Sequence, residues 1–343
     1  MDFYTDITKA NIDDYLYEYK VILCKLRSSR LKAKQIAILE MLFLQFDNEI
    51  LFVKNGPLGD VKGLISFLCP AKNLAAFKER LKFLGYFYTF YLLDFDNFTQ
   101  KNIPGLNSMN PMIWKGKKFS VSVFFNTDNK IFTEQAPNSR KFKIVDIDNV
   151  IREIKGYRGD GTDTGKRALP VEDARCMVNL SLPFKNKRMI DPFAGAGGII
   201  FQFKYIMPKG TMTSIDIDPI LKPGLEAYGA AHYVMNSGDA SFPENSFDSV
   251  ITETPFSDNA ETDIINTLKK IDACLSKDGV YIIMCNEDQS EFVYKTMEEL
   301  KYFQLFSHEI DRKGTDVEIQ IWHKTDALLN EMKDFISVLK EIY

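Results

Sequence analysis

A short stretch near the middle of the chain constrains its fold more than any other feature. An apolar run ends in an acid, Asp191, and a glycine-rich turn that closes at Gly198 leads into a second apolar run at 199–206. This order predicts a β-strand, a tight turn and an α-helix. Such a corner is typical of nucleotide binding, because glycines let the backbone approach a ligand and the helix N-terminus offers free N–H groups. A tight turn without a ligand is the alternative.

The glycine spacing distinguishes between nucleotide chemistries. A dinucleotide fingerprint reads G-x-G-x-x-G, but after Gly195 and Gly197 its third position is Ile200. A P-loop ends in Gly-Lys-Ser/Thr, which is absent here. The acid four residues before Gly195 is Asp191, which can accept hydrogen bonds from a cationic amino group. The corner therefore favours the methionine end of S-adenosylmethionine over a pyrophosphate.

Further acids follow the next two predicted strands. The apolar run 211–215 ends at Asp216, at about the distance from the glycines where an acid binds ribose hydroxyls. Asp218, before Pro219, is a helix-capping candidate. A third strand, Ala231 to Ser237, leads to Asp239, which is either an acceptor for an adenine amino group or an ordinary turn aspartate.

Four motifs together resemble a known family. They are Arg167–Pro170 with Asp173–Leu180, Asp191–Gly198, Asp216–Asp218, and Glu253–Phe256 after a fourth strand at 247–252. The set is similar to class I S-adenosylmethionine-dependent methyltransferases, and within them to the tRNA guanine-N2 methyltransferases that often carry an RNA-binding THUMP domain in front. The resemblance covers about half the chain, roughly Arg158 to Lys324.

The resemblance implies a fold and a cofactor. The fold is α/β, a Rossmann-like seven-stranded methyltransferase sheet, with a smaller α+β N-terminal domain. The cofactor is S-adenosyl-L-methionine, and the residues expected to bind it share the corner or the strand ends: Asp191, Phe193, Gly195, Gly197, Asp216 and Asp239.

The last motif departs from the family's Asp-Pro-Pro-Tyr. Glu253 takes the place of the acid, Thr254 replaces the first proline, and Phe256 replaces the tyrosine, while Pro255 is kept. Losing a proline frees one φ angle. Glu253 is expected to accept from the amino group that is methylated, Pro255 to form a rigid turn, and Phe256 to stack on the base. Thr254 and Arg167 are expected to contact the substrate.

The acid also bears on the choice of base. Guanine presents adjacent N–H donors that one carboxylate can accept together, whereas adenine pairs a donor with an acceptor. Glu253 thus favours methylation of a guanine amino group, and the resemblance implies that this guanine lies in tRNA. Three other functions remain: methylation of a protein amide or small-molecule amine, RNA binding without catalysis, and, least supported by the glycine spacing, a nicotinamide enzyme.

Composition and spacing suggest the domain organisation. A chain of 343 residues with 45% hydrophobic content is long enough for two buried cores. We expect an α+β domain over 1–150, a glycine-rich connecting loop over 151–170 and a methyltransferase domain over 171–325. A C-terminal helix over 326–343 is expected either to cap the sheet or to join two subunits of a homodimer.

Hydrophobic periodicity locates most of the other elements. Helices are predicted at 31–46, 71–84, 171–182, 260–275 and 287–300, and strands at 50–53, 64–68, 86–93, 119–125, 279–285, 303–310 and 317–323, with a hairpin turn at 312–315.

Charge is divided unevenly along the chain. Residues 1–150 carry 21 Lys and Arg against 16 Asp and Glu, whereas the remainder carries 22 against 31. The front domain is therefore the better candidate for an anionic partner such as RNA, as in a THUMP-like module, although a packing or dimerisation domain fits equally well.

The remaining signals concern location and metals. No apolar run reaches the length of a membrane span, and the N-terminus is too acidic and polar for a signal peptide, so we expect a cytoplasmic protein without a membrane partner. The five cysteines are scattered without a C-x-x-C pair, and no histidine has ligand partners at metal-binding spacing. Reduced thiols and no metal site are expected.

Overall fold

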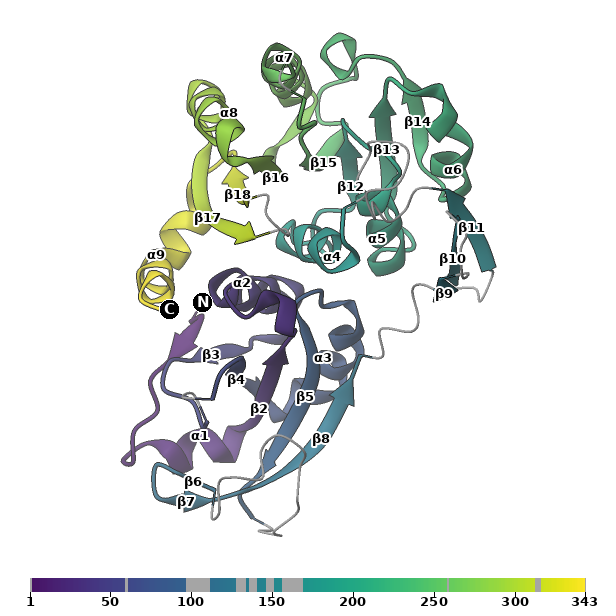
Figure 1. Cartoon of the computed structure of the whole chain (residues 1–343). Helices are drawn as coiled ribbons and strands as arrows, with labels where there is room; N and C mark the ends of the chain where they lie inside the picture. The colour runs from purple at the N-terminus through teal and green to yellow at the C-terminus, as the bar shows by residue number, and fades with distance from the viewer. Residues whose placement is uncertain are drawn as a thin grey trace. The chain divides into compact units, whose positions relative to one another are not determined.

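The computed structural model describes residues 2–58, 61–96, 112–127, 134–135, 141–145, 151–155, 169–257, 259–311 and 316–342. The chain divides into two compact units, Met1–Asp128 together with Asp334–Tyr343, and Asn129–Lys333 (Figure 1). Each unit is built on its own large sheet.

The first unit is built on a six-stranded sheet with the order β1-β3-β4-β2-β5-β8. β1 and β3 are parallel, and the other neighbours are antiparallel. A separate two-stranded ribbon pairs β6 with β7. The strands are β1 (Tyr4–Thr5), β2 (Tyr19–Leu26), β3 (Leu51–Val53), β4 (Leu64–Pro70), β5 (Phe87–Asp94), β6 (Ile113–Trp114), β7 (Lys117–Lys118) and β8 (Ser120–Asn126).

The helices of this unit are short. They are α1 (Ile12–Glu18), α2 (Lys34–Leu44) and α3 (Leu74–Arg80), with 3₁₀ turns η1 (Ser28–Arg30), η2 (Phe46–Asn48), η3 (Ala71–Asn73) and η4 (Leu81–Phe83). In α2 every residue from Ile36 to Leu44 is buried, including Glu40. The Glu40 carboxylate accepts hydrogen bonds from the backbone N–H groups of Gly85 and Tyr86, at 2.5 and 3.1 Å, which compensates for its burial.

The C-terminal helix α9 (Ala327–Lys340) ends in the first unit. Its Phe335 ring lies 6.0 Å from the Phe3 ring and 6.3 Å from the Phe52 ring, centroid to centroid. Glu341 accepts a hydrogen bond from Lys54 at 2.9 Å. The end of the chain is thus part of the core of its N-terminal unit.

The second unit contains a seven-stranded sheet with the order β14-β13-β12-β15-β16-β18-β17. Numbered within the sheet, this order is 3-2-1-4-5-7-6. The strands pair in parallel except β16 with β18 and β18 with β17. The predicted Rossmann-like α/β class is confirmed. The strands are β12 (Arg188–Asp191), β13 (Thr211–Asp216), β14 (Ala231–Val234), β15 (Phe247–Glu253), β16 (Leu275–Asn286), β17 (Phe303–Asp311) and β18 (Asp316–His323).

Helices cover both faces of this sheet. α4 and α5 lie side by side on one face and α7 and α8 on the other (Figure 1). The helices and turns are α4 (Val171–Leu180), α5 (Gly198–Ile206), η6 (Pro219–Leu221), α6 (Lys222–Ala227), η7 (Ser237–Asp239), α7 (Glu261–Asp272) and α8 (Glu287–Glu299). In the described part of the chain no helix has both the length and the apolar content needed to cross a membrane.

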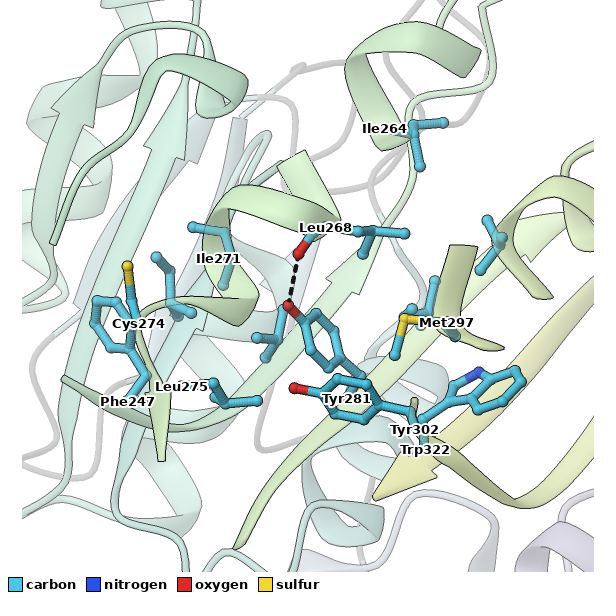
Figure 2. Close-up of a cluster of buried hydrophobic side chains, with 14 of the residues drawn as sticks. Phe247, Ile264, Leu268, Ile271, Cys274, Leu275, Tyr281, Met297, Tyr302 and Trp322 are labelled. Atoms are coloured by element: carbon cyan, nitrogen blue, oxygen red, sulfur yellow. Dashed lines mark hydrogen bonds between the residues drawn. The ribbon is translucent and has the colours of Figure 1, made fainter. Parts of the chain in front are cut away.

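A buried cluster joins α7 and α8 to the sheet. Figure 2 shows Leu268 and Ile271 of α7 near Tyr281 and Met297 of α8 near Trp322, all within this cluster. The Tyr281 hydroxyl donates to the Leu268 carbonyl oxygen at 3.1 Å, so the polar end of this fully buried ring has a partner. Because β15 and β16 are fixed by this core, the segment after β15 starts from a rigid position.

The elements differ from the predictions at several places. Residues 151–155 of the expected connecting loop form a strand, β11, in a small antiparallel sheet with β10 (Lys141–Val145) and β9 (Glu134–Gln135). Leu275, predicted to end a helix, lies in β16 opposite Phe247. β2 was not predicted, and residues 156–168 and 312–315 lie outside the described residues.

Candidate functional site

The glycine corner connects β12 to α5. Gly195 and Gly197 have φ angles of +50° and +85°, which residues other than glycine rarely adopt. A Cβ added to Gly197 would lie 2.7 Å from Cδ2 of Leu225, so glycine is also needed there for packing. A Cβ added to Gly195 would meet no atom within 4 Å. The backbone at Gly195 thus borders open space.

Asp216 at the end of β13 supports the corner. One oxygen of its half-buried carboxylate accepts from the Gly195 N–H at 2.8 Å, and the other accepts from the Asp218 N–H at 2.9 Å. A carboxylate oxygen has more than one acceptor position. Asp216 can therefore hold the turn and still accept from the hydroxyls of a ligand.

Asp191 lies beneath the corner and is 1% exposed. Its Oδ1 accepts from the Thr252 hydroxyl at 2.7 Å and from the Phe193 N–H at 3.2 Å. Burial raises the pKa of the Asp191 carboxyl to about 7; the charges of Asp216 and Glu253 act in the same direction, and the two hydrogen bonds oppose them. A cationic group bound nearby would favour the ionised form.

The segment 253–256 begins where β15 ends. Glu253 is half-buried, and the exposed fraction of Phe256 is 41%. Thr254 faces the interior instead, at 2% exposure. Its backbone N–H donates to the Met284 carbonyl oxygen at 2.9 Å, and its hydroxyl donates to Oε1 of Gln289 at 2.6 Å. The side chain of Thr254 is therefore engaged within the protein.

The other predicted residues occupy different positions. Asp239 is exposed at the end of η7, where its N–H donates to the Asn236 carbonyl oxygen at 3.0 Å. Phe193 packs partly buried against the core cluster of α7 and α8. Arg167 lies outside the described residues.

The sheet brings the main predicted acids together. β12 lies between β13 and β15, and all three run parallel, so Asp191, Asp216 and Glu253 end adjacent strands at the same edge. The order of the strands reverses direction at β12, and ligands bind at such a point in open α/β sheets. Across the described residues, no group of three or more His, Cys, Asp or Glu side chains could hold a metal ion.

One residue of this site was missed from the sequence. Gln289 of α8 is 5% exposed and contacts both Thr254 and Pro255. The only local signal was the Asn286-x-x-Gln289 spacing of a capping box, which predicts the start of a helix and says nothing of the segment after β15.

Comparison with known proteins gives two curated relatives. The chain is 33% identical over 119 residues to a tRNA (guanine(10)-N2)-dimethyltransferase of Pyrococcus abyssi, a match that covers 31% of this chain and 36% of the relative. It is 26% identical over 167 residues to a probable tRNA (guanine(10)-N2)-dimethyltransferase of Methanothermococcus thermolithotrophicus, covering 45% of this chain and 98% of the relative. The chain thus spans about a third of the length of the first relative. Both names agree with the resemblance identified from the motifs. No family model matches the chain.

Solved structures show weaker likenesses. TrmN from Thermus thermophilus has a TM-score of 0.40 at 15% identity and covers 46% of this chain and 49% of its own. TYW2 from M. jannaschii, solved with AdoMet, has a TM-score of 0.39 at 12% identity and covers 60% of this chain and 91% of its own.

Proposed function

We propose that this protein is an S-adenosylmethionine-dependent methyltransferase that modifies the exocyclic amino group of a guanine in tRNA. One observation carries the proposal. Asp191, Asp216 and Glu253 gather at one edge of the sheet, where the Gly195 backbone borders open space and the Phe256 ring is partly exposed. Asp191 and Asp216, which suit a cationic nucleoside, thus lie at the same edge as Glu253 and Phe256, which suit a nucleic-acid base.

The corner fits the cofactor. Asp216 would accept from the ribose hydroxyls with the positions that Gly195 and Asp218 leave unused. Asp191 would offset the positive charge of the methionine end, and that charge would in turn favour the ionised form of the acid. The exposed carboxylate of Asp239 would accept from the adenine amino group.

Transfer depends mainly on alignment. Bound S-adenosylmethionine supplies a methyl group on a sulfonium centre. The amino nitrogen of a base is a poor nucleophile because its lone pair is delocalised into the ring, so the protein must hold it in line with the methyl group. Glu253 would accept from the amino N–H, and Phe256 would stack on the base, a contact of roughly 1–3 kcal/mol.

The carboxylate of Glu253 favours guanine. It can accept from two adjacent donors on the Watson–Crick edge of guanine, whereas an amide suits the mixed donor and acceptor of adenine. Replacing Glu253 by Gln should therefore lower guanine methylation, measured with labelled cofactor. Undiminished guanine methylation by this variant would contradict the assignment.

The proposal of tRNA as the substrate is supported by the curated relatives and by charge. Both relatives are named as tRNA guanine-N2 dimethyltransferases. The excess of Lys and Arg over Asp and Glu in residues 1–150 would let this part of the chain attract the phosphates of an RNA. Arg167 is a further candidate for a phosphate contact.

The test is to identify the methyl acceptor. The protein is incubated with S-adenosylmethionine carrying a labelled methyl group, in separate reactions with total RNA, protein extract and small metabolites. We expect label in tRNA, recovered after digestion as N2-methylated guanine. Label in protein or metabolites alone would contradict the substrate, and binding of S-adenosylhomocysteine without transfer to any fraction would contradict the activity.

A further inference from the structure

The segment 254–257 belongs to no helix or strand. The backbone N–H of its first residue, Thr254, donates to the Met284 carbonyl oxygen at 2.9 Å. A proline at this position would fix its φ angle, whereas threonine does not. Because Glu253 and Phe256 must face the reacting groups in the proposed reaction, this stretch needs a restraint from elsewhere.

The side-chain amide of Gln289 supplies contacts to two successive residues of the segment. Its Oε1 accepts from the Thr254 hydroxyl at 2.6 Å, and its Nε2 donates to the Pro255 carbonyl oxygen at 2.7 Å. Oε1 also accepts from the Asn286 N–H at 3.3 Å. A backbone carbonyl can only accept and a backbone N–H can only donate, so these partners fix the orientation of the amide and the donor role of the threonine.

Gln289 is itself held in place. It is the third residue of α8, and its N–H donates to the side chain of Asn286 at 2.9 Å, which completes a capping box. It is also 5% exposed, so its hydrogen bonds are shielded from water. The start of α8 and the segment after β15 are therefore joined through one buried amide.

We propose that Gln289 is a positioning residue that, through Thr254 and Pro255, orients Glu253 and Phe256 for methyl transfer. Thr254 and Pro255 lie between Glu253 and Phe256 in the chain. The amide of Gln289 therefore sets the direction in which the side chains of Glu253 and Phe256 point. Thr254 is part of this support, in place of the direct substrate contact expected from the sequence. The inference rests on the proposed function.

The kinetic test uses variants that remove one hydrogen-bonding group each. Gln289→Met and Thr254→Val should lower kcat by roughly 10- to 100-fold, the range expected when a reacting group is displaced by a fraction of an ångström to 1 Å. The affinity for S-adenosylhomocysteine should stay within about twofold, because the corner is untouched. Thr254→Ser keeps the hydroxyl and should retain most of the activity. The double variant should lose less than the product of the two single losses.

A matched control separates positioning from general destabilisation. Gln320 is 1% exposed in the same unit, and its amide bonds to Ser290, Glu318 and Trp322. Gln320→Met removes the same chemical group from a residue whose amide contacts α8 at Ser290 and not the segment, so it should lower the unfolding temperature without the fall in kcat. An equal fall in kcat for Gln320→Met and Gln289→Met would overturn the proposal.

Hydrogen exchange tests the restraint without relying on activity. The Thr254 N–H should exchange at least several-fold faster in Gln289→Met than in the wild type, and at the wild-type rate in Gln320→Met. Unchanged exchange at Thr254 would overturn the inference even if the enzyme is active. Faster exchange in a protein that transfers no methyl group would support the restraint while contradicting the proposed function, so the two failures are distinguishable.

Discussion

The glycine corner and the segment 253–256 lie at the same edge of one sheet but are held in different ways. In the corner, the carboxylate of Asp216 holds Gly195, 21 residues earlier, and Asp218, two residues later. The segment depends on Gln289, 35 residues after Thr254 and 34 after Pro255. The corner is thus supported mostly by its own βαβ unit, whereas the segment is supported from a different helix. Changes in the corner should affect cofactor binding and stability, and changes in the segment should affect transfer.

The largest effect is expected for Asp216→Ala. This change removes acceptors for two backbone N–H groups and for the proposed ribose contact, and each hydrogen bond to a charged group contributes about 1.5–3 kcal/mol. Affinity for S-adenosylhomocysteine should fall by roughly 100-fold or more, measured by calorimetry. Phe256→Ala serves as the control and should bind the cofactor like the wild type. The same loss in both variants would mean that the two regions are not separate.

A change in pH tests Asp191, whose bond to Thr252 links the corner to β15. Its pKa is raised in the folded protein to about 7, so its contribution to stability is full below about pH 4 and is lost as the pH rises through 7. Between pH 5 and pH 8 the free energy of unfolding of the second unit should fall by about 3 kcal/mol from this group. Urea unfolding of the wild type and of Asp191→Asn at several pH values measures it. Parallel pH profiles for the two proteins would refute the assignment.

A glycine pair tests the geometry of the corner. Gly197→Ala places a Cβ at a φ of +85° and 2.7 Å from Leu225, so it should destabilise the unit by about 2 kcal/mol and weaken cofactor binding. Gly224→Ala is the matched control, because its added Cβ would meet no atom within 4 Å. Thermal unfolding of both variants gives the comparison. If the two changes have the same effect, the conformation at Gly197 is not a requirement.

The smallest effect is expected for Phe256→Ala on transfer. The ring is 41% exposed, so its loss should leave stability unchanged and lower kcat/KM for the RNA by about tenfold, or about 1.4 kcal/mol. Phe256→Tyr keeps the aromatic face and should retain activity. If Phe256→Ala keeps the wild-type kcat/KM, the aromatic ring takes no part in the reaction.

The corner was predictable because its signals are local. Asp191, Asp216 and Glu253 each follow an apolar run, and parallel strands align their carboxyl ends, so the sequence alone indicated where these acids would lie. The two glycines likewise mark a turn through their own backbone freedom. For these residues, the order along the chain carries most of the information about their place in the fold.

The support of the segment was not predictable, because it joins residues that are far apart in the sequence. The bond from Thr254 to Gln289 depends on how α8 packs against β16 and β18, and no sequence motif contains both residues. β2 was missed although its consecutive apolar residues, Val21–Cys24, are consistent with a short buried strand. The support of the segment depends on tertiary packing, which a single sequence does not reveal.

The most direct test of the central claim is a crystal structure of the protein with S-adenosylhomocysteine. We predict that the ribose hydroxyls will lie against Asp216 and that the sulfur will face Glu253 and Phe256. A nucleoside bound at another place, or a corner filled by side chains of the protein itself, would contradict the account.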